Sequence, residues 1–137
     1  MATLDDFIGR WKLVESDGFE EYMKAIGVGI ITRKAAAHLK PTVEILKDGD
    51  TWHWNQYSTF KNTKLTFKLG EEFEDHSPDD KTYRSVLVFK DGKLIQSQNK
   101  IREQDHSSVF TSWLDGDLLI STYESGGVVC RRVFKKE

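Results

Sequence analysis

Short segments rich in β-branched and aromatic residues recur along the chain, and residues that favour tight turns separate them. The clearest segments are 51–60, 83–89, 107–114, 118–123 and 128–134. Strand-like segments flank the pairs Asp48-Gly49, Asp91-Gly92, Asp115-Gly116 and Gly126-Gly127. Such pairs adopt the positive φ angles that tight hairpins need. The pattern therefore predicts consecutive antiparallel strands joined by hairpins, in a sandwich or a barrel.

One stretch near the start follows a helical period instead. Apolar side chains recur there three and four residues apart, at Phe19, Tyr22, Met23 and Ile26. We expect Asp17 to cap the start of this helix and Gly27 to end it. A second helix is predicted over 29–39 and ends before Pro41. The predicted order is one strand, two short helices and about nine further strands, with the helices as a lid over one end of a closed sheet.

The predicted strands carry polar residues on both faces. These residues are Thr51, His53, Asn55, Gln56, Gln96, Ser97, Gln98, Asn99, Ser121 and Thr122. A dry barrel core would show a cleaner alternation, whereas a cavity with water and a ligand tolerates inward polar groups. A barrel of about ten strands is also wide enough for an interior cavity. We therefore predict an all-β fold, an antiparallel up-and-down barrel with room for a ligand.

Composition narrows the class of protein. The 137 residues include 20 Lys and Arg and 22 Asp and Glu, which gives a net charge of −2. This length predicts one domain over 1–137, with the lid at about 18–39, and the charge excludes a protein that coats nucleic acid. No apolar run reaches the ~18 residues of a membrane span, and Asp5 and Asp6 stand where a signal peptide would be basic. With Cys130 as its only cysteine, the protein is expected in the cytoplasm, with entry into the nucleus left open.

No constellation of reactive side chains stands out. The histidines are scattered, at His38, His53, His76 and His106, with no partner at metal-binding spacing. Neither a nucleophile-elbow nor a metalloprotease motif occurs, and nothing in the sequence pairs a base with Cys130. We therefore expect no catalytic residue, no metal and no cofactor.

A series of motifs extends over almost the whole chain. In order, they are 7–12 (FIGRWK), 18–24 (GFEEYMK), 32–34 with 40–41 (TRK and KP), 58–63 (STFKNT), 67–73 (FKLGEEF) and 129–134 (VCRRVF). Their order and spacing resemble the intracellular lipid-binding proteins, which include the cytosolic fatty-acid-binding and cellular retinoid-binding proteins. The resemblance implies a lipocalin-like (calycin) barrel with a helix-turn-helix lid, one internal lipid site, a monomer and no enzymatic activity. An enzyme or scaffold built on the same barrel is the remote alternative.

The resemblance also implies where a ligand headgroup binds. Members that bind acids use an Arg-x-Tyr pair on the last strand and a second Arg two strands earlier. The corresponding residues here are Arg132, Phe134 and Ser112, while Val43 stands where retinol binders carry a Lys. Without the resemblance, Arg132 would be assigned as a solvated strand charge. A buried Arg needs an anionic partner, which an acid offers and an alcohol does not.

We therefore expect the ligand to be a long-chain fatty acid, with retinoic acid as a close relative and retinol as the alternative. Because Ser112 and Phe134 replace an Arg and a Tyr, the carboxylate has fewer direct donors. We expect ordered water or a different ligand pose to compensate.

The remaining candidate residues line the cavity or lie on the lid. The expected cavity and portal residues are Phe19, Met23, Val28, Val43, Trp54, Gln56, Ser58, Phe60 and Asp79. For Phe19 and Met23, ordinary packing of the helix on the barrel is an equally good interpretation. Lys24, Arg33 and Lys34 lie in a stretch without acidic residues, 22–43, and predict transient contact of the lid with anionic membranes. The alternative is a solvated helix face.

Overall fold

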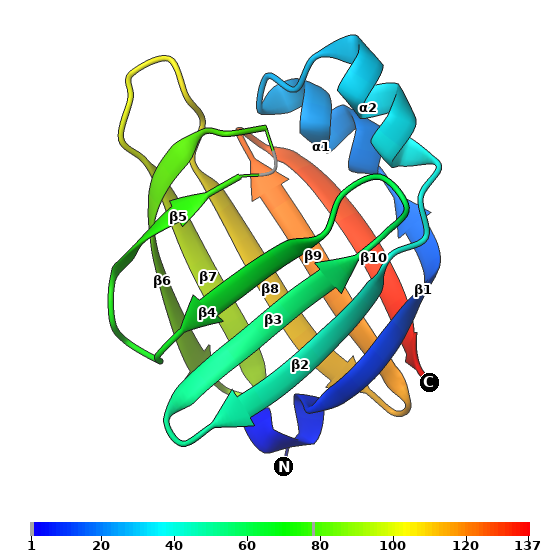
Figure 1. Cartoon of the computed structure of the whole chain (residues 1–137), viewed down its shortest axis with the longest axis vertical. Helices are drawn as coiled ribbons and strands as arrows, with labels where there is room; N and C mark the ends of the chain where they lie inside the picture. Colours follow the sequence, from blue (N-terminus) through cyan, green and yellow to red (C-terminus); the bar gives the residue numbers. More distant parts are fainter. Residues whose placement is uncertain (1, 78) are drawn as a thin grey trace.

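The computed structural model describes residues 2–77 and 79–137. In it, ten antiparallel strands follow one another along the chain, and two helices interrupt them once, after the first strand (Figure 1). A short 3-10 helix, η1 (Leu4–Phe7), precedes β1 (Gly9–Asp17), α1 (Phe19–Ala25) and α2 (Ile30–Ala37). The remaining strands are β2 (Thr42–Asp48), β3 (Thr51–Tyr57), β4 (Thr63–Phe67), β5 (Phe73–His76), β6 (Thr82–Lys90), β7 (Lys93–Lys100), β8 (Ser108–Asp115), β9 (Leu118–Ser125) and β10 (Val128–Lys136). The predicted order of strands and helices is confirmed, and η1 is an addition to it.

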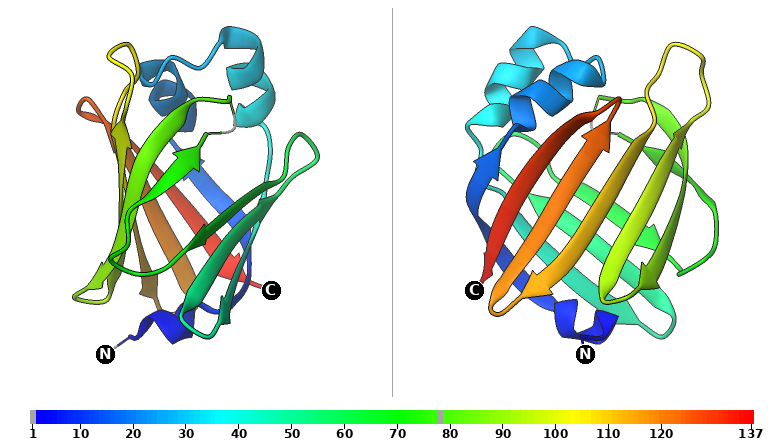
Figure 2. Two further views of the ribbon diagram at one scale, coloured as in Figure 1. Left: turned by 60° about the vertical axis from the view of Figure 1, so that its left-hand side comes forward. Right: turned by 180° about the vertical axis from the view of Figure 1, so that it is seen from behind.

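The sheet wraps around into a barrel that hydrogen bonds do not fully close. Its strand order is β4-β3-β2-β1-β10-β9-β8-β7-β6-β5, so the first and last strands pair with each other. The consecutive strands β4 and β5 lie at the two edges of the sheet and diverge from the bend that joins them (Figure 2). The expected closed sheet is therefore corrected to a nearly closed barrel with one unpaired seam.

One predicted turn is confirmed and one strand end differs from its predicted position, each for a local reason. At Asp91-Gly92 both residues have left-handed φ angles, 54° and 78°, as a two-residue hairpin requires. Strand β3 ends at Tyr57 rather than at residue 60, because the Ser58 hydroxyl accepts hydrogen bonds from the backbone N–H groups of Phe60 and Lys61, at 3.3 and 3.1 Å. The chain turns there instead of extending the strand.

The lid begins directly after β1, without a loop. Asp17, the predicted cap, is the last residue of β1, and the N-cap of α1 is Gly18 with a left-handed φ of 79°. A Cβ at this position would lie 2.8 Å from the carbonyl oxygen of Val129, so only glycine fits both the angle and the space. Gly27 follows α1 with a φ of 86°, as predicted for the residue that ends this helix.

Hydrophobic side chains gather in two clusters. The larger cluster lies at the end of the barrel away from the helices and includes Phe7, Trp11 and Phe134. There the Trp11 indole N–H donates to the Phe7 carbonyl at 2.9 Å, which anchors η1 across the barrel end. The smaller cluster, with Tyr22, Met23 and Cys130, lies where α1 packs on β9 and β10. The predicted core position of Trp11 is confirmed.

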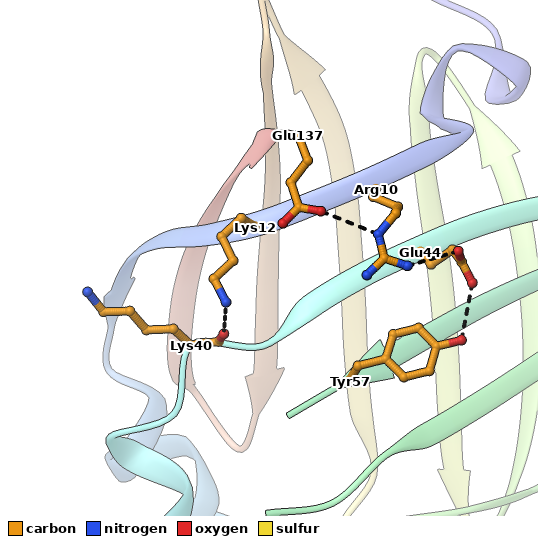
Figure 3. A network of polar contacts seen from close by, with 6 residues as sticks. All are labelled: Arg10, Lys12, Lys40, Glu44, Tyr57 and Glu137. Carbon is orange, nitrogen blue, oxygen red and sulfur yellow. Dashed lines mark hydrogen bonds and ion pairs between the residues drawn. The ribbon is translucent and has the colours of Figure 1, made fainter. Parts of the chain in front are cut away.

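A polar network on the outer surface joins β1 to its neighbours (Figure 3). The Arg10 guanidinium contacts the carboxylates of Glu44 at 3.1 Å and Glu137 at 3.3 Å. Tyr57 on β3 donates to Glu44 at 3.1 Å, and Lys12 donates to the carbonyl of Lys40 at 2.8 Å. These contacts fix the register of β1, β2 and β3 and tie the segment after the lid to β1.

Candidate functional site

A cavity of about 310 Å³ lies inside the barrel, between the lid and the sheet. Its lining combines apolar side chains from α1, such as Phe19 and Met23, with polar side chains from β7 to β10. This size and composition are those of sites for small organic ligands. The predicted interior cavity is therefore present, and its polar groups identify what it can bind.

Arg132 is the most deeply buried charge of the cavity. It lies on β10 with 1% of its surface exposed, between Cys130 and Phe134 on the same inward face. Its Nε donates to the Ser16 hydroxyl at 3.2 Å, and its guanidinium carbon lies 3.9 Å from the centre of the Phe19 ring. Nη2 is buried and has no hydrogen-bond partner among residues 2–77 and 79–137.

Within the same described ranges, no carboxylate forms an ion pair with Arg132. A buried guanidinium without a counter-charge is costly, and an anionic group that enters the cavity would offset this cost. The arrangement can therefore hold an anion inside an apolar cavity.

A row of hydroxyl groups continues from Arg132 across the sheet. Arg132 is paired in register with Ser16 on β1 and Ser121 on β9, and Ser121 is paired with Ser112 on β8. The hydroxyl oxygens of Ser112 and Ser121 lie 2.7 Å apart, and both residues line the cavity. The structure thus brings the predicted residues Arg132 and Ser112 into one row.

Tyr123 is a headgroup candidate that the sequence analysis missed. It lines the cavity on β9 and contacts Phe19, with the ring centres 6.2 Å apart. Burial raises the pKa of its hydroxyl, although the neighbouring Arg132 charge partly opposes the change. The hydroxyl therefore stays protonated and can donate a hydrogen bond beside the guanidinium. Tyr123 lies two residues after Ser121 on the same strand, so the two side chains share one face, and this spacing could have predicted its inward position.

Most of the predicted cavity and portal residues line the cavity. They are Phe19, Met23, Val28, Trp54, Gln56, Ser58, Phe60 and Asp79. At the portal, Lys81 joins Asp79, at 3.0 Å, to the carbonyl of Ile26 at the end of α1, also at 3.0 Å. Burial opposes ionisation of Asp79, but hydrogen bonds from Ser77 and Lys81 prevail and lower its pKa. These contacts connect the portal turn to the lid.

Two predicted residues lie elsewhere. Val43 and Phe134 are fully buried in the cluster at the far end of the barrel and do not line the cavity. The alternation of a strand specifies which face a residue occupies but not its depth along the barrel axis. Both residues point inward into the core cluster, and their predicted part in binding a headgroup stays a prediction.

The basic residues of the lid do not form one free positive face. Glu20 pairs with Lys34 at 2.6 Å and with Arg33 at 3.7 Å, so an acid just before the acid-free stretch neutralises part of it. Lys24 is exposed. The most exposed apolar side chains of the lid are Ile30 and Ile31, at 60% and 85%.

Other reactive groups show no catalytic arrangement within the described part of the chain. There, no group of three or more His, Cys, Asp or Glu side chains lies close enough to hold a metal ion. Burial raises the pKa of the Cys130 thiol to about 11, so the thiol stays protonated and is a poor nucleophile. No helix among these residues is long and apolar enough to cross a membrane.

Comparisons with known proteins agree with this geometry. The sequence model of the lipocalin / cytosolic fatty-acid binding protein family matches residues 8–137. Fatty acid-binding protein homolog 7 of Caenorhabditis elegans is 63% identical over 137 residues, which is the full length of both chains. The crystal structure of apo lipid binding protein 8 from the same organism has a TM-score of 0.99 and 57% identity, and covers 100% of this chain and 99% of that one. A Schistosoma mansoni fatty acid binding protein in complex with arachidonic acid has a TM-score of 0.91 and 34% identity, with 99% of each chain covered.

Proposed function

Because the chain belongs to the lipocalin / cytosolic fatty-acid binding protein family, we propose that it is a carrier that binds one long-chain fatty acid in its cavity. Binding inside the barrel would shield the acyl chain from water and keep the acid in solution for transport within the cell. The relatives named fatty acid-binding proteins, and the arachidonic acid complex of one structural neighbour, support this proposal.

The observation that carries the proposal is the unpartnered Nη2 of Arg132. A fatty acid supplies a carboxylate for this charge and an apolar chain for the rest of the cavity. We place the carboxylate at Arg132, with the Tyr123 hydroxyl and the Ser112–Ser121 pair as additional donors. Phe134 takes no part in this pose, and Tyr123 takes over the hydroxyl that Phe134 lacks.

The acyl chain would extend from this headgroup site along Phe19, Met23 and Trp54 towards the portal at Phe60 and Asp79. Trp54 is bulky for a cavity-lining position and would limit the width of the chain that fits. Retinoic acid also has a carboxylate and an apolar body, so it is the second acid that we expect to bind.

Native mass spectrometry tests the proposal directly. The purified protein is equilibrated with a mixture of oleate, all-trans retinoic acid and all-trans retinol. We expect a dominant one-to-one complex with oleate or retinoic acid. A dominant retinol complex would refute the charged anchor at Arg132. The absence of any complex would refute the carrier itself.

The proposed carrier is monomeric and cytoplasmic, and it catalyses no reaction. The cytosolic binding proteins of its family and the protonated, buried Cys130 are consistent with this view. Sedimentation of the purified protein tests the first point, and localisation of a tagged chain in cells tests the second. The absence of catalysis is tested by incubating the protein with oleate and with methyl oleate, both of which should be recovered chemically unchanged.

We also propose that the lid contacts anionic membranes during ligand transfer. The exposed pair Ile30 and Ile31 can insert into the interface, and the exposed Lys24 and Lys34 can approach anionic headgroups. Arg33 is largely buried beside Glu20 and can add only to the local positive potential. Transfer of a fluorescent fatty acid to vesicles should then accelerate with vesicle concentration and with anionic lipid content. The double variant Ile30→Asn, Ile31→Asn should lose this dependence. A wild-type rate that is indifferent to both variables would contradict membrane contact.

A further inference from the structure

A second polar cluster lines the cavity at Asp75 on β5. One oxygen of this carboxylate, Oδ2, accepts hydrogen bonds from Ser85 at 3.0 Å, Gln96 at 3.1 Å and Gln98 at 2.9 Å. Three of these residues, Asp75, Gln96 and Gln98, line the cavity, and Ser85 is fully buried behind them. The cluster therefore belongs to the wall of the ligand cavity and not to the outer surface.

The carboxylate of Asp75 is incompletely satisfied. All three donors converge on Oδ2, whereas no described residue donates to Oδ1. No Lys, Arg or His of the described ranges forms an ion pair with Asp75. An ionised carboxylate has about four acceptor sites, so Oδ1 of this cavity-lining residue retains acceptor capacity.

Asp75 and Arg132 lie far apart along the cavity wall. Four strands, β6 to β9, separate β5 from β10 in the sheet. Five inter-strand steps of ~4.8 Å give about 24 Å of curved wall between the two strands, which places β5 and β10 on opposite walls of the cavity. A ligand whose carboxylate binds Arg132 would therefore meet Asp75 with its chain and not with its headgroup. A negative charge at that place repels a second carboxylate and attracts a hydrogen-bond donor.

We propose that Asp75 forms a second subsite of the cavity, which binds a hydroxyl group carried on the acyl chain of the ligand. The hydroxyl would donate to Oδ1, and its own oxygen could accept from the second N–H of the Gln98 amide, because the Gln96 amide already donates to both Asp75 and Ser85. An unsubstituted chain leaves this acceptor without a donor or requires water there. The inference rests on the proposed function and deepens it, since it selects hydroxylated fatty acids among the long-chain acids.

Two matched ligand pairs test the subsite. Ricinoleate differs from oleate by one mid-chain hydroxyl, and ω-hydroxypalmitate differs from palmitate by one terminal hydroxyl. For the pair whose hydroxyl reaches Asp75, we expect the wild-type protein to bind the hydroxylated acid about tenfold more tightly. Asp75→Leu should abolish this preference, so that the variant binds the hydroxylated and the unsubstituted acid of each pair with similar affinity.

The preference is measured as the ratio of the affinities for the hydroxylated and the unsubstituted acid in the same variant. A general effect of the substitution on folding or on the lid changes both affinities and cancels in this ratio. Glu74→Gln is the matched control, because Glu74 precedes Asp75 on the same strand but is exposed on the outside. If Asp75→Leu does not fold, Asp75→Asn removes the charge with the same shape and should reduce the preference. No preference in either pair, or a preference that survives both Asp75 variants, would overturn the subsite alone. Failure of the wild type to bind oleate and palmitate would instead overturn the proposed function.

Discussion

The guanidinium carbon of Arg132 on the last strand lies 3.9 Å from the centre of the Phe19 ring on the first helix of the lid. The proposed headgroup anchor is thus in direct contact with the element that covers the cavity. A cation over an aromatic face contributes ~0.5–2 kcal/mol, most when the pair is desolvated, as it is here. The lid and the headgroup site are therefore energetically coupled.

A double-mutant cycle should detect this coupling. Phe19→Leu keeps the apolar contact but removes the aromatic face, and Arg132→Gln removes the cation. We expect a coupling of about 1 kcal/mol in the free energy of unfolding by urea. Met23→Leu, on the same helix and also in the cavity lining, is the control partner and should show no coupling to Arg132→Gln. Additive effects of Phe19→Leu and Arg132→Gln would contradict the contact.

Arg132 should distinguish an acid from its ester. Arg132→Gln removes the charge and should weaken oleate about tenfold to a hundredfold, since a hydrogen bond to a charged group contributes ~1.5–3 kcal/mol. Methyl oleate, which has no charge, should bind both proteins alike in a fluorescence displacement titration. Arg131→Gln is the control, because its side chain is exposed on the same strand. Equal losses for oleate and its ester would refute the carboxylate anchor.

Tyr123 should contribute one hydrogen bond to the headgroup. Tyr123→Phe removes only the hydroxyl and should weaken oleate about threefold to tenfold, with little change for methyl oleate, as measured by calorimetry. Tyr57→Phe is the control, since its hydroxyl bonds Glu44 on the outer surface at 3.1 Å. An unchanged oleate affinity in Tyr123→Phe would remove Tyr123 from the proposed headgroup site.

Gly18 should be the glycine that tolerates substitution least. Gly18→Ala places a methyl group 2.8 Å from the Val129 carbonyl and forces a left-handed φ on alanine, so we expect a loss of about 2–3 kcal/mol in unfolding free energy. Gly126→Ala also has a positive φ, of 56°, but nothing lies within 4 Å of its Cβ. We expect Gly126→Ala to lower the unfolding free energy by about 1 kcal/mol, which measures the backbone strain without the clash. Equal losses in the two variants would show that the space at Gly18 is not limiting.

Alkaline solution should destabilise the fold through Cys130. Burial raises its folded-state pKa from about 9 to about 11, so the native state holds this proton more tightly than the unfolded state. The stability is therefore fully present below pH 9 and is lost as the pH rises towards 11. Urea midpoints measured across this window should fall less steeply in Cys130→Ala than in the wild type. Tyr83, whose pKa burial raises to about 12, acts in the same direction at higher pH and remains in both proteins.

The alternation along β10 was sufficient to predict that Cys130, Arg132 and Phe134 face inward, because a strand has a strict period of two. It could not predict the contact of Arg132 with Ser16. The register between β1 and β10 shifts between Leu13 and Glu15, and this bulge moves Ser16 to the place opposite Arg132. Period-two counting from the buried Leu13 would have pointed Glu15 inward instead.

A periodic pattern also does not predict how deep along the barrel axis a side chain lies, or which side chains from different strands meet inside the barrel. The motif placed Phe134 beside Arg132 on the inward face of β10, but it could not predict that Phe134 packs in the core cluster with Phe7 and Trp11. The cluster around Asp75 draws on β5, β6 and β7, whose relative stagger depends on two hairpins. The hairpin signals predicted that these strands pair but not which side chains meet inside.

The pairing of β1 with β10, combined with the unpaired seam between β4 and β5, has a consequence for the order of folding. Strands that are close in sequence can pair early in folding. The pairing of β1 with β10, from Trp11–Lys136 to Asp17–Arg131, instead joins the two ends of the chain, so closing this long loop has a large entropic cost. Because β10 provides Arg132, the proposed headgroup anchor, a growing polypeptide on the ribosome can form several hairpins but cannot complete the proposed site. Ligand capture during synthesis must therefore wait until β10 has emerged and docked on β1, and the fatty acid can act only on the final stage of folding.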